Sequence, residues 1–103
     1  MAKIKAYQLE DLPMGSMKEV EFEDESILLI HLEQGVFAVN GLCTHASVHL
    51  AGGWIEEGKT ICCPQHGGKF AIATGKAVAF PAFRSLETYP VSVENDEIFV
   101  ELD

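Results

Sequence analysis

Long hydrophobic runs are missing from this sequence: its purely apolar stretches are only a few residues long, as at Ile27–Ile30. A helix that crosses a bilayer needs about 20 mostly apolar residues, so we expect no membrane span. The segment Met1–Lys5 is followed by neither the apolar core nor the cleavage site of an export signal. We therefore expect a cytoplasmic protein.

Basic residues are scarce. The chain has 7 Lys and Arg against 16 Asp and Glu, and its formal net charge is -9. Such acidity repels a phosphate backbone, so we expect no nucleic-acid binding. It suits brief docking onto basic patches of protein partners, although net charge also simply keeps a small protein in solution. The sequence contains no G-x-G-x-x-G segment, so nothing indicates a dinucleotide site.

Cysteines are few and odd in number, at Cys43, Cys62 and Cys63. Three cysteines cannot all pair within one chain, and without an export signal a disulfide framework is not expected. In a reducing cytosol, cysteines that lie near histidines in the sequence indicate a metal site or a catalytic role.

Sustained helical periodicity is also absent, and β-strand patterns dominate. Two hairpins are predicted, one with its turn at residues 33–35 and one with its turn at Asn95–Asp96. With 103 residues, the chain predicts a single all-β domain over residues 1–103. The expected strands cover residues 3–9, 18–22, 27–32, 36–39, 89–93 and 97–101, with a short helical turn at 10–12.

The middle of the chain, at about residues 41–83, has a different composition. It contains 7 of the 9 glycines, all three cysteines and three of the four histidines. Glycine lets the backbone turn tightly and approach a bound group closely. We predict a loop-built, metal-binding subdomain inserted into a framework of small antiparallel sheets. Its own short strands are expected at residues 54–56, 60–62 and 69–71.

Two short segments carry the candidate ligands: Cys43-Thr44-His45 and Cys63-Pro64-Gln65-His66. Each offers one thiolate and one imidazole, which lie too close in sequence to grip one small ion comfortably. A two-iron two-sulfur cluster spreads four outer ligands over two metals, and in its His-substituted form the cysteines bind one iron and the histidines the other. The predicted cofactor is therefore a 2Fe-2S cluster, with metal ligands Cys43, His45, Cys63 and His66.

Neighbouring residues suit such a site. Gly67-Gly68 and Gly52-Gly53 would let backbone N–H groups approach bridging sulfides. Phe80–Phe83 predicts a third, apolar loop that limits water at the metals. Zinc also accepts two Cys and two His, so a zinc-binding structural module is an alternative, although zinc spacings commonly pair Cys with Cys and His with His.

The segments Gly41–His45 and Cys63–Phe70 resemble the two halves of the Rieske iron–sulfur motif, and F-A-I-A-T-G at residues 70–75 is similar to the pattern that commonly follows. The resemblance covers nearly the whole chain. It is closest to the ferredoxin components of bacterial aromatic-ring-hydroxylating dioxygenase systems. It implies a Rieske fold of three small antiparallel sheets with the cluster at one tip.

By the same resemblance, the chain is an electron carrier and not itself an enzyme. The implied partners are an NADH-dependent flavoprotein ferredoxin reductase and a terminal oxygenase, and we expect a monomer. An alternative is a small Rieske subunit bound permanently to another oxidoreductase, such as an assimilatory nitrite reductase.

The chain departs from respiratory Rieske proteins at three positions. By resemblance, those proteins carry a disulfide between the loops and a serine near the second histidine; Val48, Gln65 and Gly68 stand at the matching positions here. Fewer hydrogen bonds to cluster sulfur stabilise the reduced state less. We therefore predict a reduction potential near the lower end of the Rieske range, roughly -150 mV.

Seven further residues receive local predictions. Cys62 is expected to be a small buried core residue, because an unligated cysteine packs like an apolar group. His49 is expected in an exposed loop or behind the ligands, and His31 on the polar face of its strand. Trp54 is expected to pack the base of the metal-binding subdomain. Thr44 is a candidate for a local hydrogen bond, and Lys69 and Arg84 are candidate docking charges.

Overall fold

The structure, a computed structural model, describes residues 2–44, 48–65, 67–80 and 84–102. Its strands form three antiparallel sheets: a terminal sheet in the order β1-β11-β10, a central sheet β2-β3-β4-β9 and an insert sheet β5-β6-β7-β8. The all-β prediction is confirmed. The elements are β1 (Ala2–Gln8), η1 (Leu9–Asp11), β2 (Met17–Phe22), β3 (Glu25–Leu32), β4 (Gly35–Asn40), η2 (Leu50–Gly52), β5 (Trp54–Glu56), β6 (Thr60–Cys62), β7 (Lys69–Ala71), β8 (Ala77–Ala79), β9 (Thr88–Tyr89), β10 (Val91–Glu94) and β11 (Glu97–Leu102).

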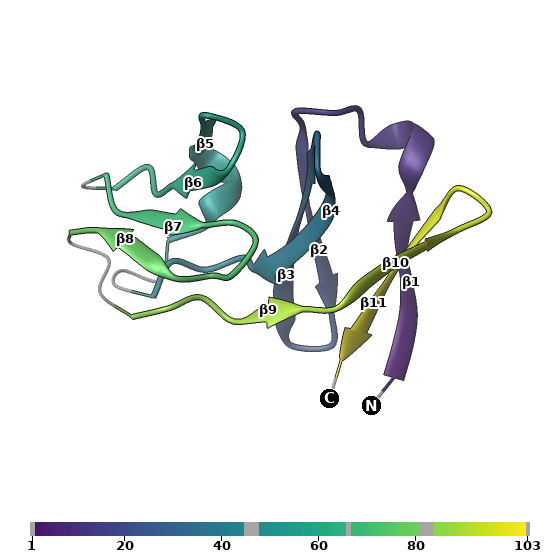
Figure 1. Ribbon diagram of the computed structural model, residues 1–103. Helices are drawn as coiled ribbons and strands as arrows, with labels where there is room; N and C mark the ends of the chain where they lie inside the picture. The colour runs from purple at the N-terminus through teal and green to yellow at the C-terminus, as the bar shows by residue number, and fades with distance from the viewer. Residues whose placement is uncertain (1, 45–47, 66, 81–83, 103) are drawn as a thin grey trace.

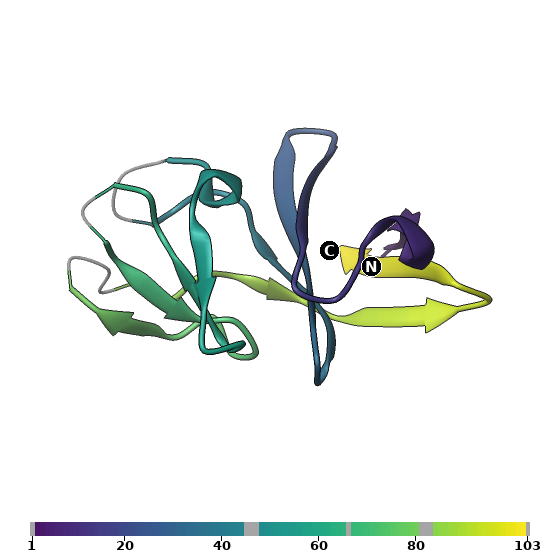
Figure 2. The ribbon, with the colours of Figure 1, turned by 90° about the horizontal axis from the view of Figure 1, so that it is seen from above.

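The central sheet stands between the other two sheets, and the two termini lie together on the side of the terminal sheet (Figures 1 and 2). Both helices, η1 and η2, are single turns of three residues. Within the described part of the chain, no helix is long and apolar enough to cross a bilayer.

Strand β3 is buried on both of its faces, which explains the continuous apolar run at its centre. Leu28 and Ile30 point toward the insert sheet, into a core that we call the insert-side core. Ile27 and Leu29 point the other way, into the terminal-side core, which also holds Ile98. All five side chains have 0% exposure, so the alternation of a strand divides one apolar run between two cores.

The closing hairpin has the turn that its sequence predicts. Asn95 and Asp96 both have positive φ, 52° and 64°, which matches a two-residue turn with right-handed strand twist. The predicted single strand 89–93 is interrupted at Pro90, which has no N–H to donate. Tyr89 therefore pairs with β4 of the central sheet, whereas Val91 pairs with β11 of the terminal sheet.

The insert confirms the three short strands expected in it, β5, β6 and β7. Two elements were not predicted: η2 and the strand β8, which pairs with β7. The first strand also ends one residue earlier than expected, since Leu9 begins η1. Residues 81–83 of the predicted apolar loop lie outside the described residues.

Candidate metal centre

The first candidate loop, residues 43–48, begins just after β4. The backbone N–H of Gly41 donates to Ser26 O at 2.8 Å, and Leu42 N–H donates to Asn40 Oδ1 at 3.0 Å, which fixes the entry of the chain. The loop closes where Cys43 N–H donates to Val48 O at 2.8 Å. The Cys43 side chain is buried, with 2% exposure. The predicted ligand His45 lies outside the described residues.

The second candidate loop, residues 63–68, follows directly on β6. It closes in the same way, because Cys63 N–H donates to Gly68 O at 2.7 Å. Gly67 has φ +73°, a left-handed conformation that glycine adopts without strain. Cys63 is fully buried. The predicted ligand His66 also lies outside the described residues.

The structure brings the two predicted cysteine ligands into one environment. Cys43 and Cys63 belong to the same insert-side core, together with Leu50, Ile61 and Phe70. Two soft sulfur donors on separate loops, enclosed by apolar side chains, fit a 2Fe-2S cluster. Across residues 2–44, 48–65, 67–80 and 84–102 the structure gathers no group of three or more metal-binding side chains. The complete set of four ligands therefore stays a prediction.

A close backbone approach supports the second loop. A Cβ atom added to Gly53 would lie 1.8 Å from Cys62 O, so only glycine fits where β5 begins beside the end of β6. A Cβ on Gly52 would meet only Pro64 Cγ, at 3.7 Å. Strand packing therefore requires glycine at Gly53, whereas the expected approach of this pair to the cluster sulfides stays a prediction.

Thr44 connects the first loop to the far end of the insert. Its Oγ1 donates to Arg84 O at 2.8 Å, across 40 residues of sequence. The expectation of a local hydrogen bond was therefore wrong, because the partner comes from another segment that folds back beside the loop. Arg84 itself is exposed, as is Phe80 with 88% of its surface accessible.

His49 follows the first loop and its side chain is 58% exposed, as predicted for a loop histidine. Its Nδ1 lies 2.6 Å from Glu19 Oε2, and the same oxygen accepts a hydrogen bond from Ser26 Oγ. His31 lies half-buried on β3, with its Nδ1 2.7 Å from Leu12 O, so it is a hydrogen-bonded strand residue. Both histidines thus have structural partners.

Trp54 does not pack beneath the insert. It is 46% exposed, because it lies on the edge strand β5, and its Nε1 donates to Glu56 Oε2 at 2.9 Å. The prediction of a base-packing role was wrong, and the fully buried Phe70 fills the insert-side core instead. Lys69, expected as a docking charge, donates to Glu56 Oε1 at 2.7 Å.

These contacts shift two ionisation equilibria on the insert sheet. Hydrogen bonds from Lys69 and then from Trp54 lower the pKa of the Glu56 carboxyl from 4.5 to about 2. Burial, followed by a hydrogen bond to Glu56, raises the pKa of the Cys62 thiol to about 11. Cys62 is fully buried and remains a neutral thiol at ordinary pH, as expected of a core residue.

Sequence reasoning did not connect Glu19 or Glu56 with the two candidate loops. The spacing in the sequence does mark their hydrogen-bond donors, because His49 and Lys69 each lie six residues after a candidate cysteine ligand. Each of these donors immediately follows the residue that closes its loop. The carboxylate that accepts from each donor comes from a distant strand, so only the fold reveals the pairing.

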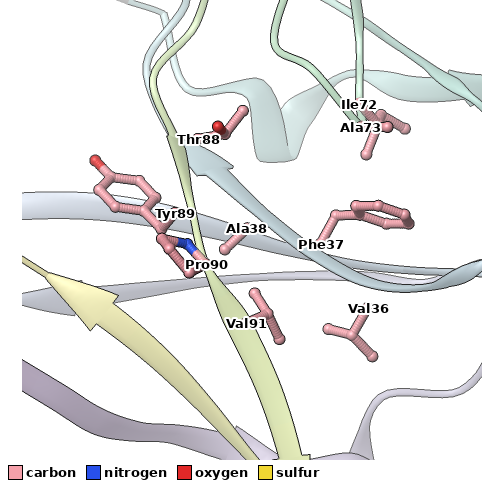
Figure 3. Close-up of a pocket in the computed structure, with 9 residues that line it drawn as sticks. All are labelled: Val36, Phe37, Ala38, Ile72, Ala73, Thr88, Tyr89, Pro90 and Val91. Atoms are coloured by element: carbon pink, nitrogen blue, oxygen red, sulfur yellow. The ribbon is translucent and has the colours of Figure 1, made fainter.

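A groove of about 460 Å³ lies away from the two loops, between the central sheet and the residues after β7 (Figure 3). Its described lining contains no cysteine, histidine or charged residue, so it offers none of the usual metal-binding side chains. The lining residues are Val36, Phe37, Ala38, Ile72, Ala73, Thr88, Tyr89, Pro90 and Val91.

Comparison with known proteins connects this geometry to a family. Residues 2–90 match the family model described as Rieske [2Fe-2S] domain. The ferredoxin component of the naphthalene 1,2-dioxygenase system of Pseudomonas putida is 36% identical over 99 residues, covering 96% of this chain and 94% of that protein.

Solved structures agree. The Sphingomonas yanoikuyae B1 ferredoxin has a TM-score of 0.91 at 33% identity and covers 99% of this chain and 100% of its own. A ferredoxin chain in a complex of reduced oxygenase and oxidized ferredoxin of carbazole 1,9a-dioxygenase has a TM-score of 0.90 at 25% identity, with 98% of this chain and 97% of that chain covered.

Proposed function

This chain belongs to the Rieske [2Fe-2S] domain family, and from that premise we propose that it binds one 2Fe-2S cluster through Cys43, His45, Cys63 and His66. The two cysteines would hold one iron as thiolates, and the two histidines would hold the other as neutral imidazoles. The burial of Cys43 and Cys63 in one apolar core supports this assignment. The single domain over residues 1–103, with its metal-binding part at about 41–83, belongs to the same proposal.

The proposed role is one-electron transfer within an aromatic-ring dioxygenase system. Electrons would pass from an NADH-dependent flavoprotein reductase to a terminal oxygenase. Relatives named as ferredoxin components of such systems support this role, and a ferredoxin of the same fold is known in complex with its oxygenase. These names favour a separate carrier over a permanent nitrite reductase subunit. We further propose a monomer located in the cytoplasm.

The bound group supplies one chemical property, reversible uptake of a single electron. The residues of the chain supply the rest. Backbone hydrogen bonds at Cys43 and Cys63 hold the two loops closed, and the apolar core keeps water from the thiol side of the site. Phe80, on the same insert, presents an exposed apolar surface to a partner.

The acidic surface suits transient encounters. A net charge of -9 attracts basic patches on partners and raises encounter rates at low salt more than it raises final affinity. A carrier that must dock and leave in each cycle benefits from this property. Arg84 is the exposed basic residue closest in sequence to the predicted apolar loop, and it belongs to the candidate docking surface.

The observation that carries the proposal is the pair of buried cysteines on two loops with the same closure. The experiment is a reconstituted electron-transfer chain of NADH, flavoprotein reductase, this protein and a terminal oxygenase. Product formation should require this protein and should saturate with its concentration. A redox titration should give a midpoint near -150 mV. A clearly positive midpoint, or oxygenase turnover that is independent of the protein, would refute the proposed role.

A further inference from the structure

The two candidate loops end in equivalent hydrogen-bonded arrangements. In each loop, the cysteine N–H donates to the carbonyl five residues later, at Val48 or Gly68. The next residue then donates a side-chain hydrogen bond to a carboxylate. His49 Nδ1 lies 2.6 Å from Glu19 Oε2, and Lys69 Nζ lies 2.7 Å from Glu56 Oε1.

Each carboxylate also accepts a second hydrogen bond from its own sheet. Glu19 on β2 accepts from Ser26 Oγ on the neighbouring strand β3. Glu56 on β5 accepts from Trp54 Nε1 on the same strand, at 2.9 Å. Two donors converging on one carboxylate fix its orientation, so the loop ends are tied to strands and not to other loops.

The identity of the acceptor also fixes the hydrogen position on His49. An ionised carboxylate only accepts, so the Nδ1 atom of His49 carries the hydrogen that lies between it and Glu19. A replacement for His49 can keep the tie only if it places an N–H at the Nδ1 position. Asparagine does so, whereas glutamine places its amide nearer to the Nε2 position.

These contacts are only partly open to water. The exposed fraction of the side chain is 58% for His49 and 23% for Glu19, and it is 36% for both Glu56 and Lys69. Such pairs contribute modestly to global stability. Their location directly after the closing residues places each pair at the end of a candidate loop.

We propose that the pairs His49–Glu19 and Lys69–Glu56 are positioning pairs that fix the ends of the two cluster-binding loops and so set the spacing of the Cys43 and Cys63 thiols. This inference rests on the proposed function, since it assumes that the loops carry the cluster. A cluster requires ligands at fixed separation, and ligands held by outer contacts retain it better than mobile ones. In each pair, the carboxylate of Glu19 or Glu56 lies on a strand of a sheet and anchors the end of the loop.

The first test compares His49→Asn, His49→Gln and His49→Ala in the cluster-loaded protein. Iron release to an excess of chelator is followed by loss of visible absorbance, and the EPR spectrum of the dithionite-reduced protein is recorded. His49→Asn should release iron within about twofold of the wild-type rate. His49→Gln and His49→Ala should release it about three- to tenfold faster, with broadened EPR lines, as expected for loss of one hydrogen bond of ordinary net strength. Since Asn and Gln carry the same charge, their difference reports geometry alone.

The second test uses Lys69→Met, Glu56→Met and the double variant. These single changes alter the net charge in opposite directions, so a purely electrostatic effect would shift the reduction potential in opposite directions and leave iron release unaffected. Loss of positioning should accelerate release in both single variants by about three- to tenfold. The double variant should be no faster than the faster single variant, because both changes break the same pair.

The matched control is Lys5→Met. Lys5 pairs with Glu97 at 2.9 Å on the terminal sheet, with side-chain exposures of 46% and 36%, so the control removes a similar charge pair outside the insert. It should leave iron release and EPR unchanged. Circular dichroism should show that every variant is folded, and recovery by His49→Asn guards against a general loss of fold.

The outcomes distinguish a failure of the proposed function from a failure of the positioning pairs. A wild-type protein that lacks iron and sulfide would refute the proposed function, and the positioning pairs with it. A fully loaded wild type whose release rate is the same in His49→Gln, in Lys69→Met and in Lys5→Met would overturn the positioning pairs alone.

Discussion

The two cores on either side of the central sheet are built from different materials. The terminal-side core consists of aliphatic side chains and Tyr89, and most of its buried residues lie on β3, β4 and β11, which are strands of six to eight residues. The insert-side core contains the cysteines Cys43 and Cys63, and the strands of its own sheet are three residues each. Strands that short are marginal without added support. The terminal side therefore has long strands of its own, whereas the insert side has only short strands and, under the proposed function, gains further support from the cluster that Cys43 and Cys63 would bind.

The central strand β3 makes this comparison testable, because it contributes buried side chains to both cores. Leu28 and Leu29 are adjacent, fully buried and chemically identical, yet they point to opposite sides. Equal losses of burial can therefore be introduced on either side of one strand. The predictions below use such matched positions.

The largest effect is expected from replacement of neighbouring cysteines. Cys63→Ser should abolish cluster binding, because serine supplies no thiolate to iron. Cys62→Ser should retain a full cluster, since Cys62 packs within the insert sheet. Iron and acid-labile sulfide are measured in both variants. Loss of the cluster in Cys62→Ser with retention in Cys63→Ser would exchange the two assignments.

The second prediction compares the effects of matched substitutions in the two cores on stability and on iron release. Leu28→Ala and Leu29→Ala should each destabilise the protein by about 2–5 kcal/mol, the usual cost of a large-to-small change in a packed core. Denaturant unfolding measures this cost. Only Leu28→Ala should also accelerate iron release, since only its cavity adjoins the core of Cys43 and Cys63. Equal acceleration in both variants would show that the cores are not separable.

The third effect concerns the two glycines at the start of β5. Gly53→Ala places a methyl group against Cys62 O and should cost roughly 1–3 kcal/mol or more in the free energy of unfolding, as overpacking does. Gly52→Ala meets only Pro64 and should be nearly neutral. Thermal unfolding of the two variants is compared with wild type. A larger loss in Gly52→Ala would contradict the packing described for β5 and β6.

The smallest effect is a pH dependence. The pKa of Glu56 is lowered from 4.5 in the unfolded chain to about 2 in the fold, so its stabilisation is complete above the unfolded value and is lost as pH falls from 4.5 toward 2. The difference in unfolding free energy between wild type and Glu56→Gln should therefore stay constant from about pH 7 down to about pH 5.5 and shrink from there to about pH 3. Denaturant unfolding across this range tests it. A difference that stays constant down to about pH 3 would show that the pKa of Glu56 is not lowered in the fold.

Much of the fold could be predicted because local sequence patterns agree with the final structure. The turn at Asn95–Asp96 and the strands β6 and β7 follow from residue type and spacing. The strand β8 could not be predicted, since its three small apolar residues form a strand only by pairing with β7. The interruption at Pro90 was missed, because the division of residues 89–93 between two different sheets depends on tertiary pairing.

The candidate site could likewise be predicted only in part from the sequence. The cysteine ligands could be proposed from sequence because their spacing reflects local loop geometry. The carboxylates Glu19 and Glu56 could not, because their partners lie 30 and 13 residues away in sequence. Trp54 was misassigned since a large aromatic residue usually fills a small core, whereas here its edge strand leaves it half-exposed and bonded to Glu56.

The proposal that this chain binds a 2Fe-2S cluster has a direct test. Iron and acid-labile sulfide are quantified in freshly purified, anaerobically handled protein, and an EPR spectrum is recorded after dithionite reduction. A protein with one 2Fe-2S cluster should contain about two irons and two sulfides per chain and show an EPR signal of low average g value. A colourless protein that contains one zinc ion and no sulfide would contradict it.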